Sequence, residues 1–311
     1  MSERVLVSTS SIGDAALALL ESAGLDVSLN PHGRKLTPEE SRALLGEVTG
    51  LVAGTERLDA EVLAAAPKLR VISRVGTGMD AIDFEAAAAR GVEVYNTPDA
   101  HVDAVAELTL GGLLALLRGI AVSDASIRTG GWQRPMGGLL RGRCVGLVGF
   151  GRVARRLATL LAPFEVTLLA SDPAVDPAEA RAAGVELLVF DALLARAEIL
   201  SLHVPGQGGR ALLNAAALQR LPRGAVLLNT ARGDLVDEAA LLTHLDADPE
   251  FSAYLDVFPE EPYRGALASH PRVLLSGHIG SYAREARVLM ERQAVEHLLH
   301  GLARTAPGAS A

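Results

Sequence analysis

The chain has 311 residues, 49% of them hydrophobic, and a formal net charge of −8 at pH 7. This length favours two domains over a single core, and the negative charge argues against a nucleic-acid-binding protein, which would carry a basic patch. Cys144 is the only cysteine, so an intramolecular disulfide and a thiolate metal cluster are excluded, and we expect no metal site. The sequence shows neither a signal peptide nor an apolar run of roughly 18 residues, so we expect a cytoplasmic protein with no membrane partner.

Short apolar runs alternate with helix-period segments along the first 98 residues. The runs RVLV, LVAG, RVISR and GVEVYN are typical of strands, and the first three lead into predicted helices over 14–23, 59–66 and 84–90. This alternation predicts a mostly parallel sheet covered by helices on both faces.

A long helix is predicted over 102–129, after which the alternation restarts at CVGLVGFG. Further strands are predicted in VTLLAS, EILSLHVP, AVLLNT, SAYLDVF and RVLLSGHIG, and a last helix is predicted over 282–303. The sequence therefore predicts an α/β protein with two domains, each a Rossmann-like, doubly wound parallel sheet.

A glycine-rich turn opens the second domain. Gly149-x-Gly151-x-x-Ala154 lies between a predicted strand and a predicted helix, where Gly149 permits a tight turn and Gly151 lets a pyrophosphate approach the helix start. Asp172 ends the next strand about 20 residues on, where a carboxylate binds the adenosine ribose and repels a 2′-phosphate. The turn predicts dinucleotide binding, with NAD favoured over NADP. The alternative is a tight turn with a capping aspartate that binds nothing.

Polar residues follow several predicted strands of the second domain, where ligands of such sheets bind. Arg232 carries a planar guanidinium suited to a carboxylate and its neighbouring carbonyl. His278 can exchange a proton near neutral pH, and Glu261 could fix its tautomer. Hydride from a nicotinamide and a proton from His278 would reduce a 2-keto acid to a 2-hydroxy acid. The alternatives are a capping histidine, a surface arginine and a solvated acid.

These residues together resemble the D-isomer-specific 2-hydroxyacid dehydrogenase family, in a short form similar to the phosphoglycerate dehydrogenase catalytic core. The resemblance runs from about Leu51 to Ala294 through RVGTGMDAID, NTPDAHVDAVAE, VGLVGFGRVARR, LHVP, LLNTARGDLVDE, LDVFPEEP and SGHIG. It implies an NAD-dependent oxidoreductase that interconverts a D-2-hydroxy acid and its 2-keto acid. It also implies a flavodoxin-like substrate domain over 1–98 and 285–311, a Rossmann NAD-binding domain over 99–284, and an interdomain cleft that closes on the substrate.

The resemblance also assigns roles to single residues. It implies that Arg232 orients the substrate, Glu261 supports the histidine and His278 is the general acid/base. The expected cofactor residues are Gly149, Gly151, Arg152, Val153, Asp172, His203, Thr230 and Asp256. The expected substrate residues are Thr77 and Gly78 for the carboxylate, with Arg74, His101 and Arg134 for a second anionic group. A homodimer through the second domain is implied as well, with the long helix and the segment around Trp132 near its interface.

Departures from the family pattern leave the substrate open. Ala53 stands where phosphoglycerate dehydrogenases tend to have an arginine for the substrate phosphate, and His101 and Ala81 replace asparagines. The loop GQGGR lacks a threonine-bearing segment, and we expect no regulatory domain after the core. A phosphate- or phosphonate-bearing acid is one expectation. Two alternatives are an NADH-sensing binding protein similar to the family's corepressors, and an oxidoreductase that acts on a phosphorus oxyanion.

Overall fold

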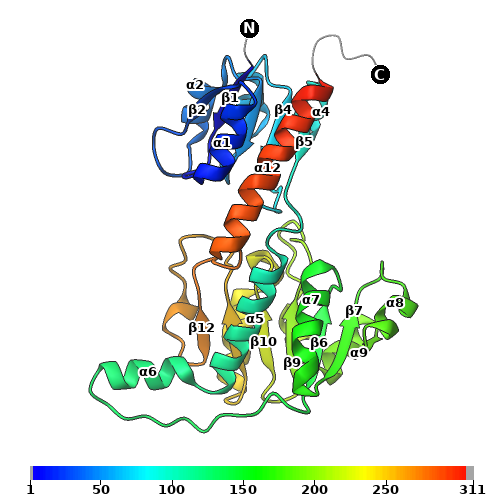
Figure 1. Ribbon diagram of the computed structural model, residues 1–311. Helices are drawn as coiled ribbons and strands as arrows, with labels where there is room; N and C mark the ends of the chain where they lie inside the picture. The colour runs from blue at the N-terminus through cyan, green and yellow to red at the C-terminus, as the bar shows by residue number, and fades with distance from the viewer. Residues whose placement is uncertain (1–2, 306–311) are drawn as a thin grey trace. The chain divides into compact units, whose positions relative to one another are not determined.

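The computed structural model describes residues 3–305, which form two compact units. Unit 1 contains the chain up to His101 and again from Ser281 on, and unit 2 is Val102–Gly280. Each unit has one sheet whose strands are all parallel, with helices on both faces (Figure 1). This confirms the predicted fold class.

Unit 1 is built on a five-stranded sheet in the order β2-β1-β3-β4-β5. The strands are β1 (Arg4–Val7), β2 (Asp26–Leu29), β3 (Gly50–Ala53), β4 (Val71–Arg74) and β5 (Glu93–Tyr95). The helices are α1 (Asp14–Ser22), α2 (Pro38–Leu45), α3 (Ala60–Ala64), α4 (Phe84–Ala89) and α12 (Arg284–Arg304). Alternate residues of β1 enter different cores: Val5 and Val7 pack with α1 and α12, whereas Leu6 packs with α2, α3 and α4.

Unit 2 is built on a seven-stranded sheet in the order β12-β11-β10-β9-β6-β7-β8. The strands are β6 (Cys144–Val148), β7 (Thr167–Ser171), β8 (Val185–Leu187), β9 (Ile199–Leu202), β10 (Val226–Asn229), β11 (Ser252–Leu255) and β12 (Val273–Leu275). The order reverses between β6 and β9, which pair in parallel although they are not consecutive. In a doubly wound sheet this reversal marks where a ligand binds, beyond the carboxyl ends of the strands.

The helices of unit 2, except Ile120–Arg128, cover the two faces of this sheet. They are α5 (Val102–Leu117), α6 (Ile120–Arg128), α7 (Arg152–Leu161), α8 (Pro177–Ala182), α9 (Phe190–Arg196), α10 (Ala215–Leu218) and α11 (Glu238–Ala247), with short 3₁₀ turns at Ala162–Phe164 (η1), Gly233–Leu235 (η2) and Ala266–Ser269 (η3). One core lies under α5, α7 and α8, and the other lies under α9, α10 and α11.

Several elements differ from those predicted from the sequence; helix α2, for example, was not predicted. The predicted helix over 102–129 is two helices, α5 and α6, because Gly119 between them has φ +59° and leaves the helical conformation. Strands β2 and β8 were not predicted, since each is a short strand at the edge of its sheet and lacks a clear apolar run. Among residues 3–305, no single helix is long and apolar enough to cross a membrane. Helices α5 and α6 together reach that length and apolar composition, but they are bent by 66° where they join.

Candidate functional site

A tight turn at Gly149 joins β6 to α7. Gly149 has φ +85°, a left-handed conformation that glycine adopts without strain. A Cβ at this position would lie 2.6 Å from the carbonyl oxygen of His203, just beyond β9. The turn therefore packs directly on the strand end across the reversal of the sheet order, which requires a glycine on steric grounds as well.

The start of α7 is open above this turn. Its N-cap residue is Gly151, so no capping side chain competes for the first amides of the helix, and no described atom lies within 4 Å of the place where a Cβ of Gly151 would be. Ala154 is fully buried, which brings the helix close to the sheet. Arg152 and Val153 lie in the first turn. Amides at the positive end of a helix dipole suit a pyrophosphate.

Asp172 follows β7 and holds the same turn. Its Oδ2 accepts a hydrogen bond from the Phe150 amide at 2.8 Å, and its Oδ1 accepts one from the Ala174 amide at 2.9 Å. Each carboxylate oxygen has a second lone pair, so Asp172 can still accept hydrogen bonds from ribose hydroxyls. The turn, the helix start and this carboxylate together fit a dinucleotide.

The corresponding turn of unit 1 is occupied by the chain's own carboxylates. The Gly13 amide at the start of α1 donates to Oε2 of Glu291 at 2.8 Å. Beyond β3, the buried Glu56 accepts hydrogen bonds from the Ser8 hydroxyl and the Gly54 amide. These donors are therefore already satisfied, which leaves the turn of unit 2 as the better dinucleotide site.

Arg232 lies just beyond β10, in a turn that Asn229 shapes. Oδ1 of Asn229 accepts from the Ala231 amide at 3.1 Å, and Nδ2 donates to the carbonyl oxygen of Arg232 at 2.8 Å. The half-buried guanidinium donates from Nη1 to the Ala231 carbonyl at 2.7 Å. Arg232 is thus at the carboxyl edge of the sheet, as is the Gly149 turn, because all strands run the same way.

Gly233 brings the loop after β11 against the Arg232 turn. A Cβ on Gly233 would lie 2.0 Å from the carbonyl carbon of Phe258 and 2.4 Å from the nitrogen of Pro259. The Phe258 amide in turn donates to Oε1 of Glu261 at 3.1 Å. The glycine after Arg232 therefore positions the loop that carries Glu261.

His278, beyond β12, is in direct contact with Glu261. Its Nδ1 lies 2.9 Å from Oε2 and 3.1 Å from Oε1 of Glu261. Because a carboxylate only accepts hydrogen bonds, Nδ1 carries the proton, which leaves Nε2 for proton transfer. His278 has φ +54°, a conformation unfavourable by about 1–2 kcal/mol for a residue with a Cβ. The surrounding loop must hold it there.

Asp256, which follows β11, holds the loop around His278 through hydrogen bonds. The residue is fully buried, and its carboxylate accepts hydrogen bonds from the Ser276 hydroxyl, the Ile279 amide and the Gly280 amide. Its carbonyl oxygen accepts from the His278 amide at 2.7 Å. Asp256 therefore organises the loop on both sides of His278.

His203 and Thr230 lie beyond β9 and β10, at the same edge of the sheet. Nε2 of His203 is 2.8 Å from the Ser201 hydroxyl, and burial lowers the pKa of His203 to about 4, so the imidazole is neutral at physiological pH. Thr230 is buried, with its hydroxyl 2.9 Å from that of Thr109 on α5. Both residues line the strand ends next to the turn, and neither carries charge.

In unit 1, hydrogen bonds hold the loop that is predicted to bind the substrate carboxylate. Oγ1 of Thr77 lies 2.8 Å from Nδ1 of His101, and the Thr77 carbonyl accepts from Nδ2 of Asn96 at 3.0 Å. The preceding amide, that of Gly76, donates to Oγ1 of Thr97 at 2.8 Å. This loop directly follows β4, and its conformation is set by hydrogen bonds from the segment after β5.

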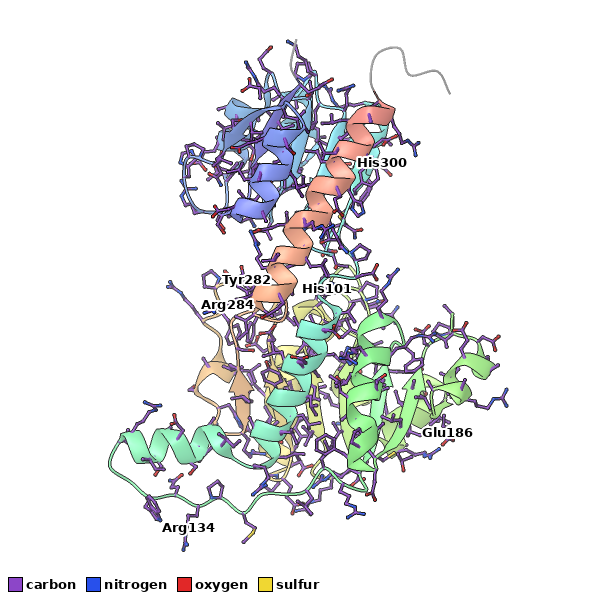
Figure 2. All side chains as sticks on the ribbon, in the orientation of Figure 1. His101, Arg134, Glu186, Tyr282, Arg284 and His300 are labelled. Carbon is purple, nitrogen blue, oxygen red and sulfur yellow. The ribbon has the colours of Figure 1, made fainter. Side chains whose placement is uncertain are left out.

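The two remaining arginines predicted for the substrate are placed differently. Arg74 ends β4 beside Thr77 and Gly78, and its Nη1 donates to the Val75 carbonyl at 3.1 Å. Arg134 lies on the extended segment after α6 (Figure 2). That segment packs on the end of α5, where the Gly138 amide donates to the Leu117 carbonyl at 2.9 Å. It then continues into β6. Arg134 is therefore at the amino edge of the large sheet and is not brought together with Arg232 or His278.

Sequence reasoning missed four residues that support the site: Thr109, Gly233, Tyr254 and Ser276. A signal existed for Tyr254, which is on β11 two residues before Asp256. Gly233 and the two hydroxyl residues carried no such signal, because their partners lie in segments distant along the chain.

Comparisons with known proteins identify similar chains. Residues 110–280 match the family model described as "D-isomer specific 2-hydroxyacid dehydrogenase, NAD binding domain". The D-3-phosphoglycerate dehydrogenase of Mycobacterium leprae is 42% identical over 241 residues, which are 76% of this chain and 46% of that protein. The human D-3-phosphoglycerate dehydrogenase is 35% identical over 289 residues, which are 91% of this chain and 54% of that protein.

The whole fold is shared with a solved structure. The TT0316 protein from Thermus thermophilus superposes with a TM-score of 0.89 at 35% identity, over 98% of both chains. The present chain spans about half the length of the curated relatives. The matched domain is described as NAD binding, which confirms NAD as the predicted cofactor. The chain belongs to the D-isomer specific 2-hydroxyacid dehydrogenase family.

Proposed function

We propose that the chain is an NAD-dependent oxidoreductase that interconverts a D-2-hydroxy acid and its 2-keto acid. The observation that carries this proposal is the contact of His278 with Glu261 at 2.9 Å, at the carboxyl edge of the sheet that contains the NAD-binding turn. A general acid next to a hydride carrier is the arrangement that carbonyl reduction requires.

The chemistry divides between the cofactor and the chain. NAD, when bound, supplies or accepts the hydride. In reduction, Nε2 of His278 gives a proton to the keto oxygen, while Glu261 holds Nδ1 and so keeps the ring oriented. The guanidinium of Arg232 grips the substrate carboxylate and polarises the carbonyl. The reverse reaction returns the proton to the same nitrogen.

We further propose the cofactor contacts. The amides around Gly151, Arg152 and Val153 bind the pyrophosphate, and Asp172 binds the ribose. His203 and Thr230, which lie beyond the neighbouring strands, are proposed to line the cofactor site. Because Asp256 is fully buried and its carboxylate accepts three hydrogen bonds, its part in cofactor binding would be indirect, through the loop that it holds.

The substrate is proposed to carry a second anionic group, such as a phosphate. The curated relatives are D-3-phosphoglycerate dehydrogenases by name, and unit 1 offers Arg74 and His101 beside the Thr77–Gly78 loop. Arg134 belongs to unit 2. A panel of 2-keto acids with and without phosphate tests this finer proposal by the ratio of kcat/KM values.

A homodimer is the second part of the proposal. Large apolar side chains are exposed on α6 and on the segment after it: Ile120, Ile127, Trp132, Met136 and Leu139 are each more than half exposed. An apolar surface of this kind marks an interaction site, and we propose that a second copy covers it.

The absence of a disulfide-forming pair of cysteines agrees with a cytoplasmic enzyme.

The test is the absorbance of the nicotinamide band in the presence of purified protein and a broad panel of 2-keto acids. Oxidation of NADH with one of them, lost in His278→Ala, is the expected result. If none is reduced, the dehydrogenase proposal is wrong. Tight NADH binding without turnover would then favour an NADH-sensing binding protein. Oxidation of a phosphorus oxyanion with NAD would favour an oxidoreductase that acts on such an anion.

A further inference from the structure

A line of hydrogen bonds, most of them partly buried, leads from Tyr254 in unit 2 to the backbone of the His278 loop. The hydroxyl of Tyr254 on β11 lies 2.8 Å from that of Ser276, which follows β12. The Ser276 hydroxyl donates to Oδ1 of Asp256, and the two oxygens of that carboxylate accept from the amides of Ile279 and Gly280, at 2.9 and 2.8 Å.

The direction of this line is determined by the chemistry of its last member. A carboxylate only accepts hydrogen bonds, so Ser276 must donate its one proton to Asp256. The oxygen of Ser276 is then an acceptor, and Tyr254 donates to it. Burial raises the pKa of Tyr254, so the phenol keeps its proton. Successive hydrogen bonds that point one way polarise and strengthen each other.

The line ends on the backbone around His278. Asp256 accepts from His278 through its carbonyl oxygen and from the next two amides through its carboxylate. Three consecutive amides are thereby fixed relative to one residue. This is the restraint that the left-handed conformation of His278, φ +54°, needs in order to persist.

The other end of the line is rigid. Tyr254 is among the largest fully buried side chains of the described residues, and its ring lies where a side chain on Gly112 of α5 would be, 2.2 Å from the position of a Cβ. The phenol therefore cannot shift toward α5. Tyr254 is on β11, and Asp256 directly follows this strand.

We propose that Tyr254, Ser276 and Asp256 form a directed hydrogen-bond relay that positions the imidazole of His278 for proton transfer. The proposal rests on the proposed function for its catalytic consequence. The three residues are positioning residues: they hold the loop, and His278 exchanges the proton.

The first experiment measures the imidazole without any substrate. Long-range ¹H–¹⁵N spectra of the full-length protein report which ring nitrogen carries the proton, and His278→Gln identifies the signal. The wild type is expected to show the Nδ1–H form. Ser276→Ala is expected to show a mixture of tautomers, because the loop no longer holds Nδ1 against Glu261. A wild-type spectrum in Ser276→Ala overturns the proposal, whether or not the protein reduces any keto acid.

The second experiment measures kcat/KM for the keto acid that the protein reduces. Ser276→Ala is expected to lower it by about tenfold, a part of what general acid catalysis contributes, with the Kd of NADH changed by less than about twofold. Tyr254→Phe keeps the ring over Gly112 and is expected to lower kcat/KM less than Ser276→Ala does. The double variant is expected to match Ser276→Ala alone, because the two act in series.

Two further variants separate the relay from general damage. Tyr95→Phe, in unit 1, removes a phenol that donates to Glu93 at 2.6 Å and is expected to leave both readouts unchanged. Ser276→Thr keeps the hydroxyl and is expected to retain the Nδ1–H form. If Ser276→Ala alters the tautomer but not kcat/KM, the catalytic part of the proposal is wrong. Equal losses in Tyr95→Phe and Tyr254→Phe would also contradict it.

Discussion

Gly233→Ala tests whether the residue after Arg232 positions the loop of Glu261. The added Cβ would lie 2.0 Å from the Phe258 carbonyl carbon and 2.3 Å from its oxygen, whereas ordinary contacts between carbon atoms are about 3.5–4.0 Å. The three nearest atoms are all backbone, so the Phe258–Pro259 segment must move by more than about 1 Å. Phe258 donates to Glu261, and therefore the carboxylate that holds His278 moves too.

The expected loss in kcat/KM is about 10²-fold, the effect of a displacement of about 1 Å at a catalytic group. Overpacking also lowers the free energy of unfolding by about 1–3 kcal/mol. Steady-state reduction of the keto acid, NADH binding by fluorescence and urea unfolding measure the three quantities separately. NADH affinity should change little, because the Gly149 turn is elsewhere on the sheet edge.

The matched control is Gly111→Ala, the same substitution in the same unit. No described atom lies within 4 Å of a Cβ at Gly111, and alanine favours the helix α5. We expect wild-type kcat/KM and equal or greater stability. Wild-type kcat/KM in Gly233→Ala would refute the inference that this glycine couples the Arg232 turn to Glu261.

Further predictions concern the cofactor, pH and the exposed segment. Asp172→Ala is expected to narrow the preference for NADH over NADPH, measured as the ratio of the two kcat/KM values; an unchanged ratio would show that Asp172 does not read the ribose. Gly149→Ala should weaken NADH binding in fluorescence titrations, because φ is +85° and the His203 carbonyl lies 2.6 Å from the new Cβ. Since the pKa of His203 is lowered to about 4 in the folded protein, the unfolded chain binds its proton first as pH falls below about 6.5. The free energy of unfolding should therefore drop by about 2 kcal/mol more between pH 7 and 5 in the wild type than in His203→Gln, and parallel urea curves for the two proteins would contradict this. Replacing Trp132 and Met136 by serine should shift the mass measured by light scattering from dimer to monomer, and a monomeric wild type would exclude the dimer.

Much of the fold follows from local patterns in the chain. Buried parallel strands such as β6, and β10 up to its last residue Asn229, are apolar, and this makes them recognisable without knowledge of their neighbours. The edge strands β2 and β8 lack this signal because fewer of their side chains are buried. The break at Gly119 was missed because the residues on both sides keep an apolar, helix-forming composition, and only the left-handed φ of the glycine ends α5.

The same division holds for the site. The glycine turn, its acidic neighbour Asp172 and the side chains Arg232, Glu261 and His278 could be proposed from local sequence, since each is a residue type with recognisable chemistry next to a strand end. Three contacts could not: Asp256 is buried under the His278 loop, Gly233 lies against Phe258, and Ser276 links Tyr254 to this network. These are contacts between segments some 20 residues or more apart, and they form because neighbouring parallel strands end at one edge. Local sequence specifies which groups arrive at that edge, whereas the distances between them depend on how the sheet is assembled.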